Sequence, residues 1–421
     1  MKFLGSAAVE RRHPARWPNA EKRVRVLLVH NFYQVPGGED SVVSEELSML
    51  RKNGVEVELF SVSNDEIRGL SATISAALQV IYNPRARYRL LKQLAEFLPD
   101  IVHVHNFFPL LSPSIFDACL QARVPCVLTL HNFRILSPAA LLHPDEMARP
   151  RGLQESCWWT VRKRVYRNSM AGTLAVAAMI EFHKRAGTWT RKVNRFVALT
   201  PWAKRMFAEA GLPDEHIVVK PNCVARAPTF GNTRRYGGLF VGHLCEQKGV
   251  GTLLRAWQEI DYPLRIIGDG PLAELAERNQ NNNVLYLGRL PRQAARREML
   301  TAKFLVMPST GWEMFPMTII EAFASHLPVI CSDLPSLSEL IEPGINGLTF
   351  AQGDADALAA QVRWALSNPS ALDELSSRAY AIYEKRYTPE ANFDQLVRIY
   401  QSVSRDQRHG AAYFPEQSIC A

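Results

Sequence analysis

The sequence has no hydrophobic run long enough to cross a membrane. A spanning helix needs about 20 consecutive apolar residues, and the longest candidate here, residues 171–180, has roughly half that number. Residues 1–23 carry several arginines but no apolar segment of the kind found in secretory signals. We therefore expect a cytoplasmic protein without a cleaved leader or a membrane span.

Cysteine is also scarce. The chain has seven cysteines, an odd number, and no two of them form a C-x-x-C pair. This pattern is typical of reduced thiols in the cytosol and gives no zinc site, so we expect no bound metal.

Two common ligand-binding patterns are missing as well. A nicotinamide dehydrogenase needs G-x-G-x-x-G with an acidic residue about 20 positions later, and neither half of the chain has the full pattern. No known nucleic-acid recognition module is visible.

The composition is that of a soluble globular protein. With 421 residues, 47% apolar and 21% charged, the chain is expected to form two domains of about 200 residues each. The net charge is +8, and all of the basic excess lies in residues 1–222. This asymmetry points to an anionic partner, namely membrane headgroups, a phosphorylated acceptor or nucleic acid, although a solvated basic face would give the same count.

Short apolar runs alternate with helical patterns in both halves, which predicts an α/β protein of two Rossmann-like β/α/β domains that face each other across a cleft. We place the N-terminal domain at 1–222, a linker at 223–236, the C-terminal domain at 237–386, a final helix at 387–405 and a loose tail at 406–421.

Three histidines lie where predicted strands end. His30, His105 and His131 each follow an apolar run, and Asn106 and Arg134 come next in the same loops. In an open parallel sheet, ligands gather at the carboxyl ends of the strands. A lone histidine at such a place is more often a hydrogen-bonded structural residue, but three equivalent positions favour a shared functional crevice.

Two carboxylates, Glu313 and Glu321, form an E-x7-E pair around the start of a predicted helix. Glu313 lies in the loop after the apolar run 304–307, and the helix should begin near Phe315–Pro316, since proline suits a first helical turn. A loop carboxylate beside a helix N-terminus is how an α/β protein places a charged group next to an anion site. The alternative is a pair of ordinary helix acids, although the apolar neighbours of Glu321 argue against solvation.

Together these motifs resemble family 4 (group 1) of the retaining glycosyltransferases with the GT-B fold. The similarity covers about residues 24–400, and three segments, HNFYQVPGGED, PDIVHVHN and TLHNFR, are similar to those of bacterial members that assemble surface polysaccharides. The motifs that carry the resemblance are the E-x7-E pair, the loop from Gly242 to Gly249, the Gly268-Asp-Gly turn, the segment Pro343–Gly347 and the Gly37–Gly38 loop.

The resemblance implies a nucleotide-diphosphate-sugar donor held mainly by the C-terminal domain. A saccharide or lipid-linked acceptor would lie on the N-terminal domain, and the final helix would cross back to that domain. Glu313 would contact hydroxyls of the transferred sugar, Glu321 the ribose, and Lys248 the diphosphate. The implied catalytic residues are Glu313, His131 and Lys248. The implied donor-binding residues are Gly37, Gly38, His243, Lys248, Glu313, Phe315, Met317, Thr318 and Glu321. The implied acceptor side comprises His30, His105, Asn106 and Arg134.

The chain departs from this family at His243, where arginine is usual. Histidine is shorter and only partly charged at neutral pH, so Lys248 is expected to carry more of the phosphate charge. Pro316 also stands where glycine is common, and we expect little effect because proline pre-sets the helix.

The implied reaction is sugar transfer with retention of configuration, in which the leaving phosphate takes the proton of the acceptor. It needs no obligatory metal or cofactor, because cationic and backbone N–H groups stabilise the diphosphate. A glycosidase would also use paired carboxylates but predicts no phosphate site. The remaining alternatives are a nucleotide-sugar epimerase of the same fold, which requires no acceptor surface, and a basic nucleic-acid-binding protein.

Residues 157–167, CWWTVRKRVYR, mix aromatic and basic side chains. They are typical of an interfacial helix on an anionic membrane, which would place the protein on the inner face of the cytoplasmic membrane. A surface helix with its tryptophans buried under the domain has the same pattern, and the sequence leaves both readings open.

Overall fold

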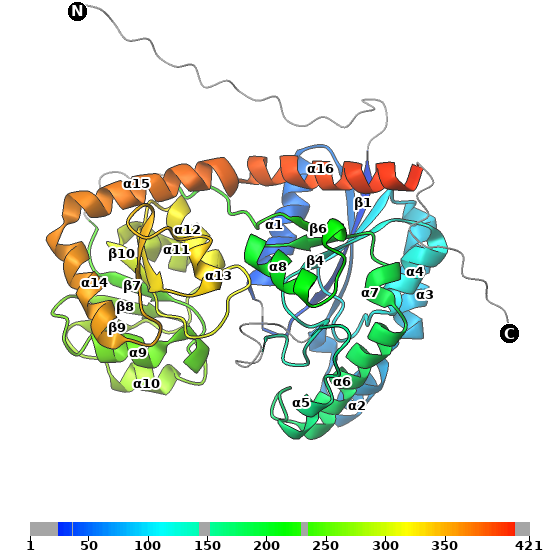
Figure 1. Cartoon of the computed structure of the whole chain (residues 1–421), viewed down its shortest axis with the longest axis horizontal. Helices are drawn as coiled ribbons and strands as arrows, with labels where there is room; N and C mark the ends of the chain where they lie inside the picture. Colours follow the sequence, from blue (N-terminus) through cyan, green and yellow to red (C-terminus); the bar gives the residue numbers. More distant parts are fainter. Residues whose placement is uncertain (1–23, 36, 143–151, 229–234, 409–421) are drawn as a thin grey trace, which may run out of the picture.

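The computed structural model describes residues 24–35, 37–142, 152–228 and 235–408. The expectations for residues 1–23, for part of the linker and for most of the tail lie outside these ranges. Within them, the chain forms two parallel six-stranded sheets, each flanked by helices, which lie side by side (Figure 1). The predicted α/β fold with two Rossmann-like domains is therefore confirmed.

The first sheet has the strand order β2-β1-β3-β4-β5-β6. Strands β3 and β4 are buried along their whole length, as expected for parallel strands covered by helices on both faces. The strands are β1 (Arg25–Phe32), β2 (Glu56–Ser63), β3 (Ile101–Val104), β4 (Cys126–Leu130), β5 (Arg195–Ala198) and β6 (Ile217–Val219). The helices are α1 (Gly38–Lys52), α2 (Gly69–Gln79), α3 (Pro84–Phe97), α4 (Ser114–Ala122), α5 (Trp159–Arg162), α6 (Met170–Arg185), α7 (Thr188–Arg191) and α8 (Pro201–Glu209), with the 3-10 turns η1 (Asn64–Glu66) and η3 (Asp214–His216).

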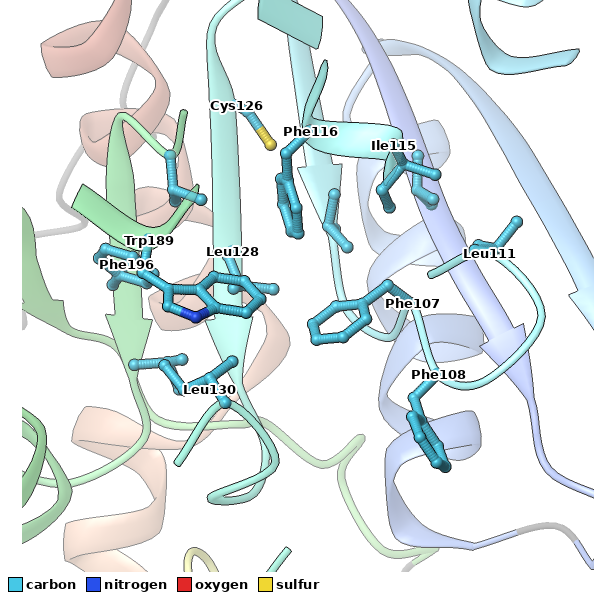
Figure 2. Packing of buried hydrophobic residues seen from close by; sticks show 14 of the residues in the cluster. Phe107, Phe108, Leu111, Ile115, Phe116, Cys126, Leu128, Leu130, Trp189 and Phe196 are labelled. Atoms are coloured by element: carbon cyan, nitrogen blue, oxygen red, sulfur yellow. The ribbon is translucent and has the colours of Figure 1, made fainter. Parts of the chain in front are cut away.

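The core of this domain packs around Trp189. Its ring lies 5.7 Å from the rings of both Phe107 and Phe116, between centroids, and Figure 2 shows Leu128 of β4 and Phe196 of β5 around it. Packing of this kind on the sheet holds β3 and β4 firmly in place. The polar residues at the ends of these strands therefore have defined positions.

The second sheet has the order β12-β11-β10-β7-β8-β9, so β7 and β10 are the neighbours at which the strand order reverses. Ligands of open α/β sheets bind at the carboxyl ends of such a pair. The strands are β7 (Gly238–Val241), β8 (Leu264–Ile267), β9 (Val284–Tyr286), β10 (Phe304–Met307), β11 (Val329–Ser332) and β12 (Gly347–Phe350). The helices are α9 (Val250–Ala256), α10 (Ala273–Arg278), α11 (Arg292–Thr301), α12 (Met317–Ala324), α13 (Pro335–Ser338), α14 (Ala355–Ser367) and α15 (Pro369–Arg386), with the 3-10 turn η4 (Glu246–Lys248).

The last helix, α16 (Pro389–Arg408), continues from α15 and runs along the first domain (Figure 1). Its apolar face, including Leu396, packs with Val26 and Leu28 of β1. It extends past the predicted end at residue 405. The chain passes between the domains after β6 and again between α15 and α16. Val224 N–H in the first of these segments donates to the carbonyl of Tyr387 in the second at 3.0 Å, so the two connections lie side by side.

Two sequence expectations need correction. The helix expected over residues 157–167 is confined to the single turn of α5, in which Trp159 is half-buried, while Trp158 just before it is 38% exposed. Strand β1 continues to Phe32, so His30 lies within the strand and not after it. Among the described helices, none has both the length and the apolar character that crossing a membrane requires.

Candidate functional site

The loops that follow β7 and β10 bring Lys248 and Glu313 together. The Lys248 ammonium pairs with Oε1 of Glu313, and the Ser309 hydroxyl donates to the same oxygen at 3.1 Å. The two side chains are 27% and 14% exposed. A cation and a carboxylate thus lie at the point where the strand order reverses, with one side open to ligands.

Gly249 makes this approach possible. Its φ of +68° lies in the left-handed region, and a Cβ atom added to it would lie 1.7 Å from the carbonyl oxygen of Pro308. Only glycine can therefore hold the β7 loop against the β10 loop at this place.

The starts of two helices from different domains meet at the end of the loop that carries Glu313. Met317 and Thr318 begin α12, and no side chain caps this helix. Gly37 precedes α1 of the first domain and Gly38 begins it, and a Cβ on Gly38 would lie 3.7 Å from Cγ of Met317. Helix N-termini carry partial positive charge, so this junction suits a phosphate or diphosphate, although the N–H of Gly37 is already bonded to Asp40.

Glu321 is buried in α12 and forms an ion pair with Arg292. Arg292 Nε donates to Glu321 Oε1 at 2.9 Å, and Nη1 of the same guanidinium lies 2.6 Å from Oε1 of Glu45 in α1. Arg292 therefore joins the second carboxylate of the E-x7-E pair to the first domain. Nothing in the sequence around Arg292 marks this role.

Two other residues expected on the donor side lie at its margin. His243 is exposed and its ring packs against Gly270, where an added Cβ would be 2.8 Å from the ring. The Phe315 side chain is buried in the core, 6.0 Å from the ring of Tyr387 between centroids. The side chain of Phe315 thus supports the loop rather than facing the open side of the Lys248–Glu313 pair.

The three predicted histidines of the first domain gather at the carboxyl edge of its sheet. His105 Nδ1 lies 3.0 Å from His131 Nε2, and the two rings are stacked. His30 is fully buried, with Nε2 2.8 Å from Oδ1 of Asp40. Because Asp40 Oδ2 also accepts the N–H of Gly37 at 2.9 Å, the carboxylate links His30 to the loop that begins α1.

The sequence analysis did not predict the role of Glu46, a buried carboxylate next to these histidines. Glu46 Oε1 lies 3.2 Å from His105 Nε2 and 3.0 Å from His103 Nδ1, while Glu46 Oε2 accepts from Lys220 at 3.2 Å. Burial acts to raise the pKa of the Glu46 carboxyl, but Lys220, His103 and His105 together hold it well below its usual range. The sequence does contain an indication that this carboxylate is buried, because Glu46 lies on the apolar face of α1 with Val42, Val43, Met49 and Leu50.

The ligand atoms of Glu46, His103 and His105 all lie within 4.8 Å of one another, which is close enough for a metal ion. However, the Lys220 ammonium already donates a hydrogen bond to the Glu46 carboxylate, and Nε2 of His103 lies 2.7 Å from the Thr129 hydroxyl. A second cation beside Lys220 would be repelled, so this donor set fits a hydrogen-bond network better than a metal centre.

Arg134 and Asn106, the other residues expected on the acceptor side, differ in their surroundings. Arg134 lies over the ring of Phe108 at 4.2 Å and, with Tyr33 and His131, lines a cavity of about 20 Å³, the size of one water molecule. Asn106 instead shapes its own loop, because it donates to the carbonyl of Asn31 and accepts from the N–H of Phe108.

Glu39 is a further residue that the sequence reading missed. It lies in the first turn of α1, and its Oε2 accepts from the Tyr33 hydroxyl at 3.0 Å, while its Oε1 is enclosed without a partner among the described residues. Burial raises the pKa of Glu39 to about 8, against the effect of the hydrogen bond from Tyr33. A protonated carboxyl at neutral pH is available here as a hydrogen-bond donor.

Comparisons with known proteins identify the family of the chain. Residues 36–227 match the model of Glycosyltransferase Family 4, and residues 236–368 match that of Glycosyl transferases group 1. The two matches together span well over half of the chain.

Relatives match over most of the chain or over part of it. A phosphatidyl-myo-inositol mannosyltransferase of Mycobacterium leprae is 24% identical over 91% of this chain and 97% of its own. The O-antigen chain mannosyltransferase B of Escherichia coli is 29% identical over 39% of this chain and 45% of its own.

Solved structures share the fold. HepE of Anabaena, solved in complex with UDP, has a TM-score of 0.62 at 17% identity and covers 90% of this chain and 100% of its own. Sucrose-phosphate synthase of Thermosynechococcus elongatus has a TM-score of 0.65 at 16% identity and covers 90% and 99%. The chain therefore belongs to glycosyltransferase family 4, with the GT-B fold, and it is a hexosyltransferase, as the sequence predicted.

Proposed function

We propose that the protein transfers a hexose from a nucleotide-diphosphate sugar to a hydroxyl of a polysaccharide or lipid-linked acceptor, with retention of configuration and without an obligatory metal. The observation that carries this proposal is the junction of Lys248, Glu313 and the start of α12 with the Gly37–Gly38 loop of the other domain. A donor diphosphate bound there meets one ammonium and two helix N-termini.

The chemistry follows from this charge distribution. The bond between the anomeric carbon and the diphosphate breaks while a bond to the acceptor oxygen forms on the same face, and the acceptor proton passes to the leaving phosphate oxygen. Lys248 and the N–H groups of α12 stabilise the negative charge that develops on the diphosphate. Glu313 accepts hydrogen bonds from hydroxyls of the transferred sugar through its carboxylate oxygens.

The acceptor side of the proposal rests on the first domain. An open cavity of about 620 Å³ lies beside α1, and most of the residues that line it carry a hydroxyl or carboxylate, including Ser44, Glu45 and Asp40, with Arg292 from the second domain. Such groups suit sugar hydroxyls. The names of the relatives, a phosphatidyl-myo-inositol mannosyltransferase and an O-antigen chain mannosyltransferase, support lipid-linked and polysaccharide acceptors.

Association with an anionic membrane surface is part of the same proposal. Helices α2 and α6 are neighbours, and in Figure 1 they lie with α5 at the end of the first domain away from α16. Leu70, Ile74 and Leu78 form an exposed stripe on α2, and Met170, Leu174 and Phe182 form one on α6, all 48% exposed or more. The exposed basic residues next to α6 are Arg162, Lys163, Arg164 and Arg167. Apolar stripes flanked by basic side chains are typical of proteins that bind the interface of anionic bilayers.

A thermal-shift panel of UDP-, GDP- and ADP-sugars tests the donor site, because a ligand that binds only the folded state raises the apparent stability. UDP-glucose belongs in the panel because HepE was solved with it, and mannosyl donors because of the mannosyltransferase relatives. We expect one nucleotide base to raise the melting temperature in the wild type and much less in Lys248→Met. No shift with any donor would contradict the proposal. The comparisons give no support to an epimerase or a nucleic-acid-binding protein.

A further inference from the structure

A chain of buried polar side chains runs from His131 into the first domain. His131 Nε2 lies 3.0 Å from His105 Nδ1, His105 Nε2 lies 3.2 Å from Glu46 Oε1, and Lys220 donates to Glu46 Oε2 at 3.2 Å. Beyond the half-buried His131, each member of the chain is at most 3% exposed. Lys220 also donates to Asn392 of α16 at 3.0 Å, which fixes the inner end.

The ring protons of the two histidines can be assigned step by step, starting from Glu46 and Lys220 at the inner end of the chain. An ionised carboxylate only accepts hydrogen bonds, and Glu46 is ionised because it pairs with Lys220. The nitrogen of His105 that faces Glu46 must therefore be the protonated Nε2. In a neutral ring the other nitrogen, Nδ1, is then an acceptor, so His131 donates to it from its own Nε2–H.

This order leaves Nδ1 of His131 unprotonated. In the part of the chain that the structure describes, that nitrogen has no hydrogen-bond partner, and His131 lines the small cavity with Tyr33 and Arg134. We propose that Glu46 and His105 are positioning residues, which hold His131 as the neutral Nε2–H tautomer and present its Nδ1 to the site as a hydrogen-bond acceptor. Under the proposed function, on which this point rests, Nδ1 accepts from a sugar hydroxyl next to the reacting carbon.

The charges around His131 favour the neutral ring. Within the described residues, Tyr33 and Arg134 line the small cavity together with it. Behind it lie His30 with Asp40, His103 with Tyr400, and His105 with Glu46 and Lys220. Burial, then His105 and His30, lowers the pKa of His131 well below its usual value, and Glu46 opposes this only in part. A neutral acceptor recognises a hydroxyl, whereas an imidazolium would donate and would attract the diphosphate instead.

NMR of wild-type protein labelled with ¹⁵N-histidine tests the tautomer directly, through two-bond ¹H–¹⁵N correlations of the rings. The His131 signals are identified by their loss in His131→Asn. Between about pH 5 and 8 we expect both His131 and His105 as neutral Nε2–H tautomers. An Nδ1–H tautomer or an imidazolium at His131 overturns the proposal. This readout needs no activity, so it decides the point even if the wild type releases no nucleotide from any donor, which is the failure that would sink the proposed function.

Two substitutions at His105 test what the positioning does for catalysis. His105→Gln keeps a donor for Glu46 and an acceptor for His131, whereas His105→Phe keeps a ring but neither group. We expect His105→Phe to lower kcat about 10- to 100-fold, by analogy with the loss of an outer partner of a metal-bound histidine. Donor KM should change little, and His105→Gln should recover most of the loss. Wild-type kcat in His105→Phe, or equal losses in both variants, would overturn the proposal.

Discussion

Arg292 of the second domain and Glu45 of the first form an ion pair, with 2.6 Å between Nη1 and Oε1. The same guanidinium donates to Glu321 through Nε. A carboxylate implied in donor binding is therefore tied to a contact that exists only while the two domains are close together. Closing domains around a donor excludes water and favours transfer over hydrolysis.

Loss of this contact should weaken the closed arrangement. Glu45→Gln removes the contact between the domains but leaves the Arg292–Glu321 bond in place. Because the Arg292 side chain is 37% exposed, the pair is screened and worth at most about 1 kcal/mol. We expect donor KM to rise up to about fivefold with kcat nearly unchanged.

A double-mutant cycle with Arg292→Gln measures the coupling between the two residues, which should disappear at about 1 M salt. Arg292→Gln alone should have the larger effect, because it also frees Glu321. If Glu45→Gln leaves both donor KM and the solution scattering profile unchanged, the contact has no part in closure.

The Lys248–Glu313 pair should matter far more for turnover than for folding. Lys248→Met removes the ammonium that offsets the charge of the leaving diphosphate, and we expect kcat/KM to fall about 10²- to 10³-fold. Glu313→Gln should also lower it severely, because an amide makes weaker hydrogen bonds to hydroxyls than a carboxylate does.

Nucleotide release in the presence of an acceptor is the measurement for both variants, with circular dichroism to check the fold. Glu274→Gln, which breaks an exposed ion pair with Arg278 on α10, is the matched control and should keep wild-type rates. Near-normal turnover in Lys248→Met would rule out its assigned role.

The parts of the site that lie on strand ends were predictable from the sequence. Lys248 and Glu313 follow apolar runs of strand length, and the reversal of strand order between β7 and β10 brings those two ends together. The Gly37–Gly38 loop was recognisable for the same reason, since it separates the first strand from the first helix.

Residues that act from the middle of helices were harder to find. Glu46 stands on the apolar face of α1, and that position alone was a usable signal. Its partner Lys220 comes from the far end of the sheet, and Arg292 reaches Glu45 only because the domains meet. Pairings between distant segments depend on how whole elements pack, and no local pattern in the sequence encodes them.

Acid should destabilise the protein through its buried neutral histidines. Burial lowers the pKa of His105 and of His183 to about 4, whereas a histidine of the unfolded chain titrates near its ordinary value of 6.5. Between these values the unfolded state binds more protons, so the free energy of unfolding falls as pH falls from 6.5 to 4, by up to about 1.4 kcal/mol per pH unit for each histidine. Denaturant titrations at several pH values give the slope. His183→Gln should reduce this slope by the amount that corresponds to the uptake of about one proton on unfolding. An unchanged slope in that variant would contradict the assignment.

Alkali should act through Glu39 in the opposite direction. Its pKa is raised to about 8 from an ordinary value of 4.5, so the folded state holds a proton that the unfolded state has lost. Stability from this group is present at low pH and declines as pH rises from 4.5 through 8. Glu39→Gln, which keeps a neutral donor for this enclosed position, should flatten the decline between about pH 7 and 8. The same decline in the variant as in the wild type would show that another group titrates there.

The exposed stripes of α2 and α6 give the last prediction, which concerns membrane binding. Leu70 and Leu78 are 77% and 73% exposed on α2, so replacing both with serine removes apolar contact with a bilayer at little cost to the fold. In sedimentation with vesicles, we expect the wild type to bind anionic lipid in a salt-sensitive way and neutral lipid weakly, because the basic residues beside α6 supply the attraction. Leu70→Ser/Leu78→Ser should bind anionic vesicles about tenfold less, since each buried CH₂ contributes about 0.8 kcal/mol and only part of each side chain is inserted.

Leu285→Ser, at a 51% exposed position of the second domain, should bind like the wild type. Equal binding of the wild type to neutral and anionic vesicles would contradict the electrostatic part of the proposal, and unchanged binding of the double variant would contradict the apolar part.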